Sequence, residues 1–170
     1  MILDTSGSLS SLRDHGEAAR LERLRRDDAR GTIGAEAARS LEAALTRAID
    51  GEVRFDAGTR ALYATDGSNY RQAPIGVVMP RHVQDVETTI RLARVLRALL
   101  LSRGGGTSLA GQCCNVAVVM DFSKYMHRVL EIDAANRLAR VEPGCVLDDL
   151  RKAARDQAGL TFGPDPETHT

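Results

Sequence analysis

The chain has 170 residues, and its 23 lysine and arginine residues balance its 23 aspartate and glutamate residues, so the formal net charge at pH 7 is zero. This length suffices for one domain that buries roughly 70% of the surface exposed by its unfolded chain. Because balanced charge creates no overall field that recruits nucleic acid or an anionic membrane, we expect a small-molecule partner instead. The sequence has no apolar run long enough for a transmembrane segment and no evident signal peptide.

The cysteine and histidine residues limit the kinds of site that are expected. Cys113 and Cys114 are adjacent and poorly placed to bridge each other, and with Cys145 they do not form a disulfide framework. This usage indicates a reducing, cytoplasmic location. The four histidine residues have no spacing typical of metal ligands, so we expect no metal site.

The chain begins with an extension and a helix. Residues 1–34 carry many charges of both signs and no aromatic residue, which is typical of a charged N-terminal extension. From 35 to 49, apolar side chains recur with helical spacing and predict a packing helix. The segment 55–73 is polar, aromatic and rich in turns, and it is interpreted either as the lining of a nucleotide site or as an ordinary lead-in loop.

A strand-helix-strand unit follows. Residues 74–79 predict an apolar strand that ends at Pro80, which lacks the N–H group needed for further pairing. Apolar positions from 83 to 96 predict an amphipathic helix, and residues 98–102 predict a second strand. If the two strands are parallel neighbours, the crossover is right-handed. The next segment then lies at the carboxyl end of a strand, where open sheets usually hold ligands.

The second half of the chain is expected to form a separate layer. Strands are predicted at 116–122, 128–133 and 138–141, and they are interpreted as a second, antiparallel layer. A helix that begins after Pro143-Gly144 carries acidic residues in its first turn, which are favourable at the positive end of a helix. A final strand is predicted at 160–162.

The most informative stretch is the segment 103–112, Arg-Gly-Gly-Gly-Thr-Ser-Leu-Ala-Gly-Gln, which lies between two apolar runs. Consecutive glycines adopt conformations closed to other residues and let a ligand touch bare backbone. Successive N–H groups in such a turn bind anions, phosphate above all. Thr107 and Ser108 add hydroxyl donors and Arg103 a positive charge, so a diphosphate suits this segment. The alternative interpretation is a flexible surface loop.

Two common phosphate-binding loops are excluded. The Walker loop needs a Gly-Lys pair, which the chain lacks, so nucleoside triphosphate hydrolysis is not expected. The Rossmann fingerprint needs a third glycine at the position of Leu109 and a long helix directly afterwards. Instead, the chain continues through Cys113-Cys114-Asn115 into another predicted strand.

The segment 103–112 resembles the pyrophosphate loop of the FAD-binding oxidase and transferase family typified by p-cresol methylhydroxylase (PCMH) and vanillyl-alcohol oxidase. It is most similar to the branch that contains glycolate oxidase and D-lactate dehydrogenase. Four further segments resemble the same branch in the right order, namely 55–71, 77–80, 119–123 and 141–144.

This resemblance implies an α+β fold, a PCMH-type FAD-binding domain of two small α/β subdomains that is truncated at its C-terminus. Residues 35–170 would be the N-terminal part of that domain, after the extension formed by 1–34. Members of the family continue into another glycine-rich flavin segment and then a substrate domain, which is absent here. A small-molecule substrate would bind through that missing domain. The resemblance is also compatible with subunit partners.

The resemblance also implies that the cofactor is FAD and that it is bound non-covalently. Covalent members carry a flavin-linked histidine at the end of the loop, where this chain has Thr107. Ser102 departs from the family, which usually has a proline before the arginine. The implied cofactor-binding residues are Arg103, Gly104, Gly105, Gly106, Thr107, Ser108, Gly111, Gln112, Pro80, Pro143, Gly144, Pro164 and Asp165.

By resemblance, the intact protein would oxidise a small 2-hydroxy acid such as D-lactate or glycolate by hydride transfer to FAD. No catalytic residue is assigned, and this chain alone is expected to be inactive. Two alternatives stay open: a catalytically inert, nucleotide-binding fragment, or a different flavin reaction on the same fold, such as sugar-nucleotide reduction or ether-lipid synthesis. The segment 55–71 favours the hydroxy-acid branch.

Overall fold

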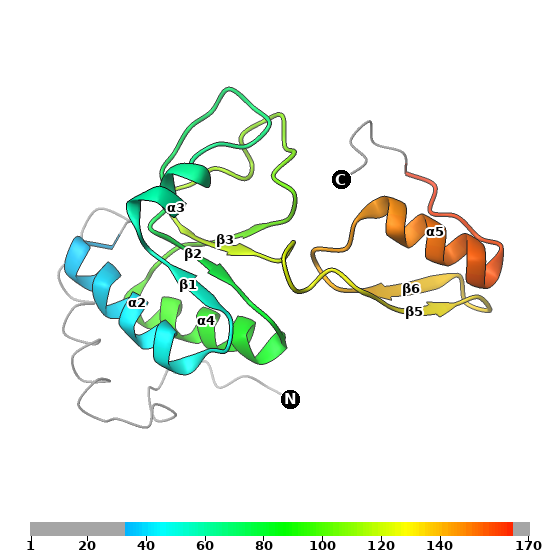
Figure 1. Cartoon of the computed structure of the whole chain (residues 1–170), viewed down its shortest axis with the longest axis horizontal. Coiled ribbons are helices and arrows are strands. Elements are labelled where there is room, and N and C mark those ends of the chain that lie inside the picture. The colour runs from blue at the N-terminus through cyan, green and yellow to red at the C-terminus, as the bar shows by residue number, and fades with distance from the viewer. Residues whose placement is uncertain (1–32, 165–170) are drawn as a thin grey trace.

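The computed structural model describes residues 33–164 of the chain. Strands β1 to β4 form one sheet, and β5 and β6 form a separate hairpin that lies beside it together with α5 (Figure 1). In chain order the elements are α2 (Ala35–Ala48), β1 (Glu52–Arg54), α3 (Ala57–Leu62), β2 (Gly76–Met79), α4 (Val83–Leu96), β3 (Leu100–Arg103), β4 (Val118–Asp121), β5 (Val129–Asp133), β6 (Leu138–Val141) and α5 (Leu147–Ala158).

The four-stranded sheet has the order β1-β2-β4-β3, with β4 parallel to both of its neighbours and β1 antiparallel to β2. The prediction that residues 116–122 belong to a second, antiparallel layer is therefore wrong, because β4 lies within this sheet between β2 and β3. All four residues of β4 are buried, as expected for the central strand of a sheet that is covered on both faces. Parallel β2, β4 and β3 end at the same edge of the sheet.

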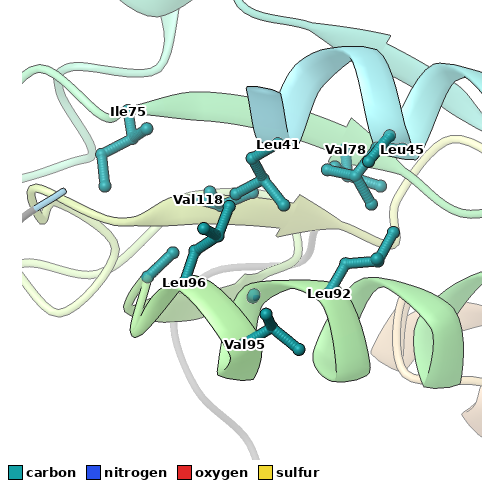
Figure 2. Close-up of a cluster of buried hydrophobic side chains, with 11 residues drawn as sticks. Leu41, Leu45, Ile75, Val78, Leu92, Val95, Leu96 and Val118 are labelled. Atoms are coloured by element: carbon teal, nitrogen blue, oxygen red, sulfur yellow. The ribbon is translucent and has the colours of Figure 1, made fainter. Parts of the chain in front are cut away.

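Helices α2 and α4 cover one face of this sheet. Leu41 and Leu45 of α2 meet Leu92 and Leu96 of α4 over Val78 and Val118, as Figure 2 shows. The predicted helices at 35–49 and 83–96 are confirmed, since the helical spacing of apolar residues produces these buried faces. Each fully buried leucine contributes about 1.5 to 3 kcal/mol to folding.

Two irregular segments cover the opposite face. The chain leaves β3 at the carboxyl edge of the sheet and enters β4 at the other edge, so residues 104–117 must cross the sheet. They run beside residues 63–75, and the N–H group of Ile75 donates to the carbonyl of Ala117 at 2.8 Å (Figure 1). Val77 and Val119 are fully buried but lie outside the helix-side cluster, which places them under these segments.

The remaining elements form the hairpin and its helix. Strands β5 and β6 pair antiparallel, and α5 packs on β5. The predicted strands at 128–133 and 138–141 and the helix after Gly144 are confirmed. The strand predicted at 160–162 is wrong: this segment is irregular, and no strand of the described residues pairs with it. No helix within residues 33–164 combines the length and the apolar character needed to cross a membrane.

An ion pair fastens the base of the hairpin. The buried carboxylate of Glu142 accepts the backbone N–H of Arg128 at 2.8 Å and the Nη2 group of the same residue at 2.8 Å. These bonds, led by that of the guanidinium, hold the pKa of Glu142 below its ordinary value of 4.5. A lowered folded pKa means that the pair stabilises the fold above pH 4.5 and loses this contribution as the pH falls through the folded pKa.

The Glu142→Gln variant is therefore expected to unfold at lower urea concentration than wild type at neutral pH. This difference should shrink well below pH 4.5, where Glu142 itself becomes protonated. Glu131→Gln is the matched control, because Glu131 and Arg140 form only an exposed pair at 3.8 Å on the same hairpin. A pH-independent difference for Glu142→Gln would contradict the role of its charge.

Candidate cofactor site

The glycine loop, defined as residues 104–112, begins where the sequence predicts a ligand. Arg103 is the last residue of β3, and the neighbouring parallel strands end at the same edge, at Met79 and Asp121. Pro80, which follows β2 and is fully buried, lies at this edge as well. The segment 55–73 is bonded to this part of the chain, through Gly67 to the carbonyl of Gly106 and through Asp66 to the N–H of Cys113, and its role as the lining of a nucleotide site stays a prediction.

Five successive N–H groups of the loop are available to a ligand. Within residues 33–164, no acceptor pairs with the N–H groups of Gly104, Gly105, Gly106, Thr107 and Ser108. Backbone N–H groups are strong donors that need an acceptor from protein, water or ligand. A row of such groups, in a segment that has no acidic side chain from 104 to 120, suits an anion.

Gly106 has a conformation that favours glycine. Its φ is 70°, in the left-handed region, and its carbonyl accepts the N–H of Gly67 at 3.0 Å. A Cβ atom at this position would lie 2.4 Å from Nη2 of Arg103. The backbone conformation therefore favours glycine at the third position of the triplet, and any side chain there would also require the guanidinium of Arg103 to shift.

The side chain of Arg103 holds the glycine loop to neighbouring segments. Its Nη1 group donates to the carbonyls of Thr65 at 2.9 Å and Cys113 at 3.3 Å, and its guanidinium lies 5.1 Å from the ring centre of Tyr63. The positive charge predicted for this position thus lies against Gly106. It adds a favourable field for an anion while its hydrogen bonds join the two ends of the loop.

The two hydroxyl groups of the loop differ. Ser108 Oγ donates to Gln112 Oε1 at 2.7 Å and accepts the N–H groups of Ala110 and Gln112, so it ties the second half of the loop together. The hydroxyl of Thr107 has no partner among residues 33–164 and is available to a ligand. Of the two predicted hydroxyl donors, only Thr107 is free to act as one.

A partly buried pair at the sheet edge, Tyr63 and Asp121, was not predicted. The hydroxyl of Tyr63 donates to Oδ2 of Asp121 at 2.5 Å, and Oδ1 of Asp121 accepts the N–H and hydroxyl groups of Ser123. Burial, and then this bond to Asp121, raise the pKa of Tyr63 above its ordinary value of 10.0. Tyr63 is thus a neutral donor that joins the segment before the loop to the end of β4.

The other predicted residues are distributed around the edge and beyond it. Gly111, with φ 74°, packs under the ring of Tyr70. Gly144 lies against the carbonyl of Phe122, so the turn at Pro143-Gly144 joins the hairpin to the sheet just past β4. Pro164 lies beside α5, where its carbonyl accepts Arg151 Nη2 at 2.5 Å. Asp165 lies outside the described residues.

One cluster of possible metal ligands lies within the described part of the chain, formed by Asp50, His82 and Asp85, whose ligand atoms lie within 4.8 Å of one another. The buried carboxylate of Asp85 accepts the N–H groups of Asp50 at 3.0 Å and Arg81 at 2.9 Å. His82 Nε2 lies 3.1 Å from Asp50 Oδ2. These contacts account for the cluster as an anchor of the start of α4, and the absence of a metal site stays a prediction.

The sequence of the chain is similar to those of known flavoprotein families and enzymes. A family model described as FAD binding domain matches residues 74–170. D-2-hydroxyglutarate dehydrogenase of Pseudomonas putida is 36% identical over 131 residues, covering 75% of this chain and 13% of that protein. Glycolate oxidase subunit GlcD of Bacillus subtilis is 31% identical over 125 residues, covering 71% of this chain and 26% of that protein. The chain therefore spans a minor part of the relatives that it matches.

Solved structures show the same fold. 4-Ethylphenol oxidase from Gulosibacter chungangensis is similar with a TM-score of 0.60 and 28% identity, over 78% of this chain and 27% of that chain. p-Cresol methylhydroxylase is similar in fold alone, with a TM-score of 0.54 and 17% identity over 84% of this chain and 25% of that chain. The expected PCMH-type fold is confirmed. Because the family model matches more than half of its residues, the chain belongs to the FAD binding domain family.

Proposed function

We propose that the glycine loop holds the pyrophosphate of FAD. The observation that carries this proposal is the row of five N–H groups at residues 104–108, which have no acceptor within the described part of the chain. Arg103 places a positive charge behind Gly106, and the Thr107 hydroxyl adds a donor beside the row. A doubly charged pyrophosphate supplies the acceptors that these groups lack.

We further propose that the cofactor is held without a covalent bond. The position that would carry a flavin-linked histidine is Thr107, whose hydroxyl is no nucleophile without a base beside it. When bound, FAD supplies hydride acceptance, and the residues of this chain bind and orient it. Pro80, Gly111, Gln112, Pro143 and Gly144 are proposed to shape the surroundings of the cofactor, and Pro164 and Asp165 to approach it from the hairpin side.

For the whole protein, we propose the oxidation of a small 2-hydroxy acid. The names of the relatives, a D-2-hydroxyglutarate dehydrogenase and a component of a glycolate oxidase, support this substrate class. The chain spans 13% of the former and 26% of the latter, so residues 35–170 are proposed to be the N-terminal part of the FAD-binding domain. The substrate would then bind to a downstream domain. The cytoplasmic location is kept as a prediction from the three cysteines, all of them free.

Flavin titration of the purified chain tests the role of the loop. Binding is followed by quenching of flavin fluorescence, with FAD and riboflavin compared and ADP used as a competitor. A loop that binds pyrophosphate predicts that FAD binds, that ADP competes with it, and that riboflavin binds at least about tenfold more weakly. Acid precipitation should release all flavin to the supernatant.

Two results would contradict the proposal. Equal affinity for riboflavin and FAD would show that the protein does not bind the pyrophosphate. Flavin that stays with the acid-precipitated protein would overturn the non-covalent attachment.

A further inference from the structure

We infer that Asp66 is a positioning residue for the anion site, because its carboxylate ties the turn at residues 65–68 to the far end of the glycine loop. This inference rests on the proposed function, since it assigns a role toward the same row of N–H groups. Asp66 does not touch the proposed ligand. It acts by fixing the backbone that does.

The carboxylate of Asp66 bonds to both segments at once. Oδ2 accepts the N–H of Cys113 at 3.1 Å, and Oδ1 accepts the N–H of Ser68 at 2.9 Å and its hydroxyl at 2.5 Å. These bonds, with the Ser68 hydroxyl first among them, hold the pKa of Asp66 below its ordinary value of 3.8. Asp66 is therefore an ionised acceptor at neutral pH, and both of its oxygens are used.

The turn is joined to the loop at two further points. The N–H of Gly67 donates to the carbonyl of Gly106 at 3.0 Å, and Arg103 Nη1 bonds the carbonyls of Thr65 and Cys113. A Cβ atom on Gly67 would lie 3.2 Å from the carbonyl oxygens of Thr107 and Ser108, so the turn packs closely under the loop. Asp66 anchors the end of the loop, and Gly67 anchors its middle.

The bond from Gly67 decides where an N–H group of the loop points. The carbonyl of Gly106 and the N–H of Thr107 belong to the same planar trans peptide, so they point in opposite directions. Because the carbonyl faces the turn, the N–H of Thr107 faces away from it, and this N–H has no acceptor among residues 33–164. The turn thus orients this donor before a ligand arrives, which lowers the entropy cost of binding.

This arrangement is separate from what holds the fold together. Asp66 lies outside both clusters of buried apolar residues, and its bonds join two irregular segments rather than helices or strands. Loss of the carboxylate should therefore loosen the loop more than it lowers the global stability. Affinity for the pyrophosphate is the property that should change.

Asp66→Asn tests the tie to Cys113 with little change in shape. The amide oxygen of asparagine can keep the bonds to Ser68, but its NH₂ group cannot accept the N–H of Cys113. We expect FAD to bind about tenfold more weakly to this variant, with the urea midpoint unchanged and riboflavin binding unaffected. Asp133→Ala is the matched control, because Asp133 accepts the N–H of Asn136 in the same way at the distant hairpin turn. It should leave FAD affinity as in wild type.

Hydrogen exchange on the wild-type chain gives a test that needs no variant. The amides of Gly67 and Cys113 should exchange more slowly than those of residues 104–108. Equal exchange rates would overturn the inference, as would unchanged FAD affinity in Asp66→Asn. If Asp66→Asn is silent while Gly106→Val loses FAD, the positioning role is wrong and the site stands. If Gly106→Val is silent as well, the proposed function itself fails.

Discussion

The Gly106→Val variant is expected to lose at least about 100-fold in FAD affinity, which corresponds to about 2.7 kcal/mol. A left-handed conformation costs about 1 to 2 kcal/mol at a residue with a Cβ atom, and the φ of Gly106 is 70°. The new Cβ atom would also lie 2.4 Å from a guanidinium that two carbonyls hold in place. Either the loop changes conformation or Arg103 gives up its bonds to Thr65 and Cys113, and both changes disturb the proposed anion site. Flavin fluorescence quenching measures the loss directly.

Gly34→Val is the matched control for this variant. A Cβ atom at Gly34, which precedes α2 and has a φ of −68°, would meet nothing within 4 Å. We expect wild-type FAD affinity for it. Circular dichroism should show that the helices of Gly106→Val are retained, because α2 and α4 pack on the opposite face of the sheet from the loop. Tight FAD binding by a folded Gly106→Val protein would show that the glycine loop does not form the FAD site.

The position of the glycine loop at the end of a strand could be predicted because it depends on local chemistry. Three consecutive glycines that follow a short apolar run predict a strand that ends in an irregular, glycine-rich turn. In the structure, the loop follows directly after β3. The helical repeat of apolar residues likewise predicted α2, α4 and α5. In these elements, the interactions that decide the structure lie within a few residues of one another.

The support for the loop could not be predicted, because it depends on contacts between distant residues. The bond from Cys113 to Asp66 joins residues 47 positions apart, and that from Tyr63 to Asp121 joins residues 58 apart. Asp66-Gly67 did carry a local signal, since Asp followed by Gly is typical of a turn, but a turn signal does not name the partner. Ser108 shows the reverse case, a hydroxyl predicted for the ligand that the loop itself uses.

The order of the strands in the sheet could not be predicted either, because it also depends on contacts between distant residues. The central position of β4 results from packing both of its faces, one against α2 and α4 and the other under the loop. Three of its four buried residues are apolar, and such a short apolar run does not indicate to which sheet a strand belongs. The sheet inserts β4 between β2 and β3, so the glycine loop that connects β3 to β4 must cross the face of the sheet.

Because the glycine loop crosses one face of the sheet and the helices cover the other, the two faces differ in their contacts. The helix face buries the leucines of α2 and α4, which belong to the larger of the two clusters of buried apolar side chains (Figure 2). The loop face carries the glycine loop, the turn at 65–68 and the Tyr63–Asp121 pair. A substitution on the helix face should therefore change the free energy of unfolding without changing the affinity of the folded protein for FAD.

The Leu92→Ala variant is expected to lower the free energy of unfolding by about 2 to 5 kcal/mol, because it removes a side chain from a well-packed core. Leu92 of α4 is 2% exposed. Ile90→Ala is the matched control on the same helix: Ile90 is 45% exposed, and we expect a change of about 0.5 kcal/mol or less. Urea unfolding measures both, and FAD titration well below the unfolding transition should give wild-type affinity for each. A loss of FAD affinity in folded Leu92→Ala as large as that in Gly106→Val would show that the two faces are not independent.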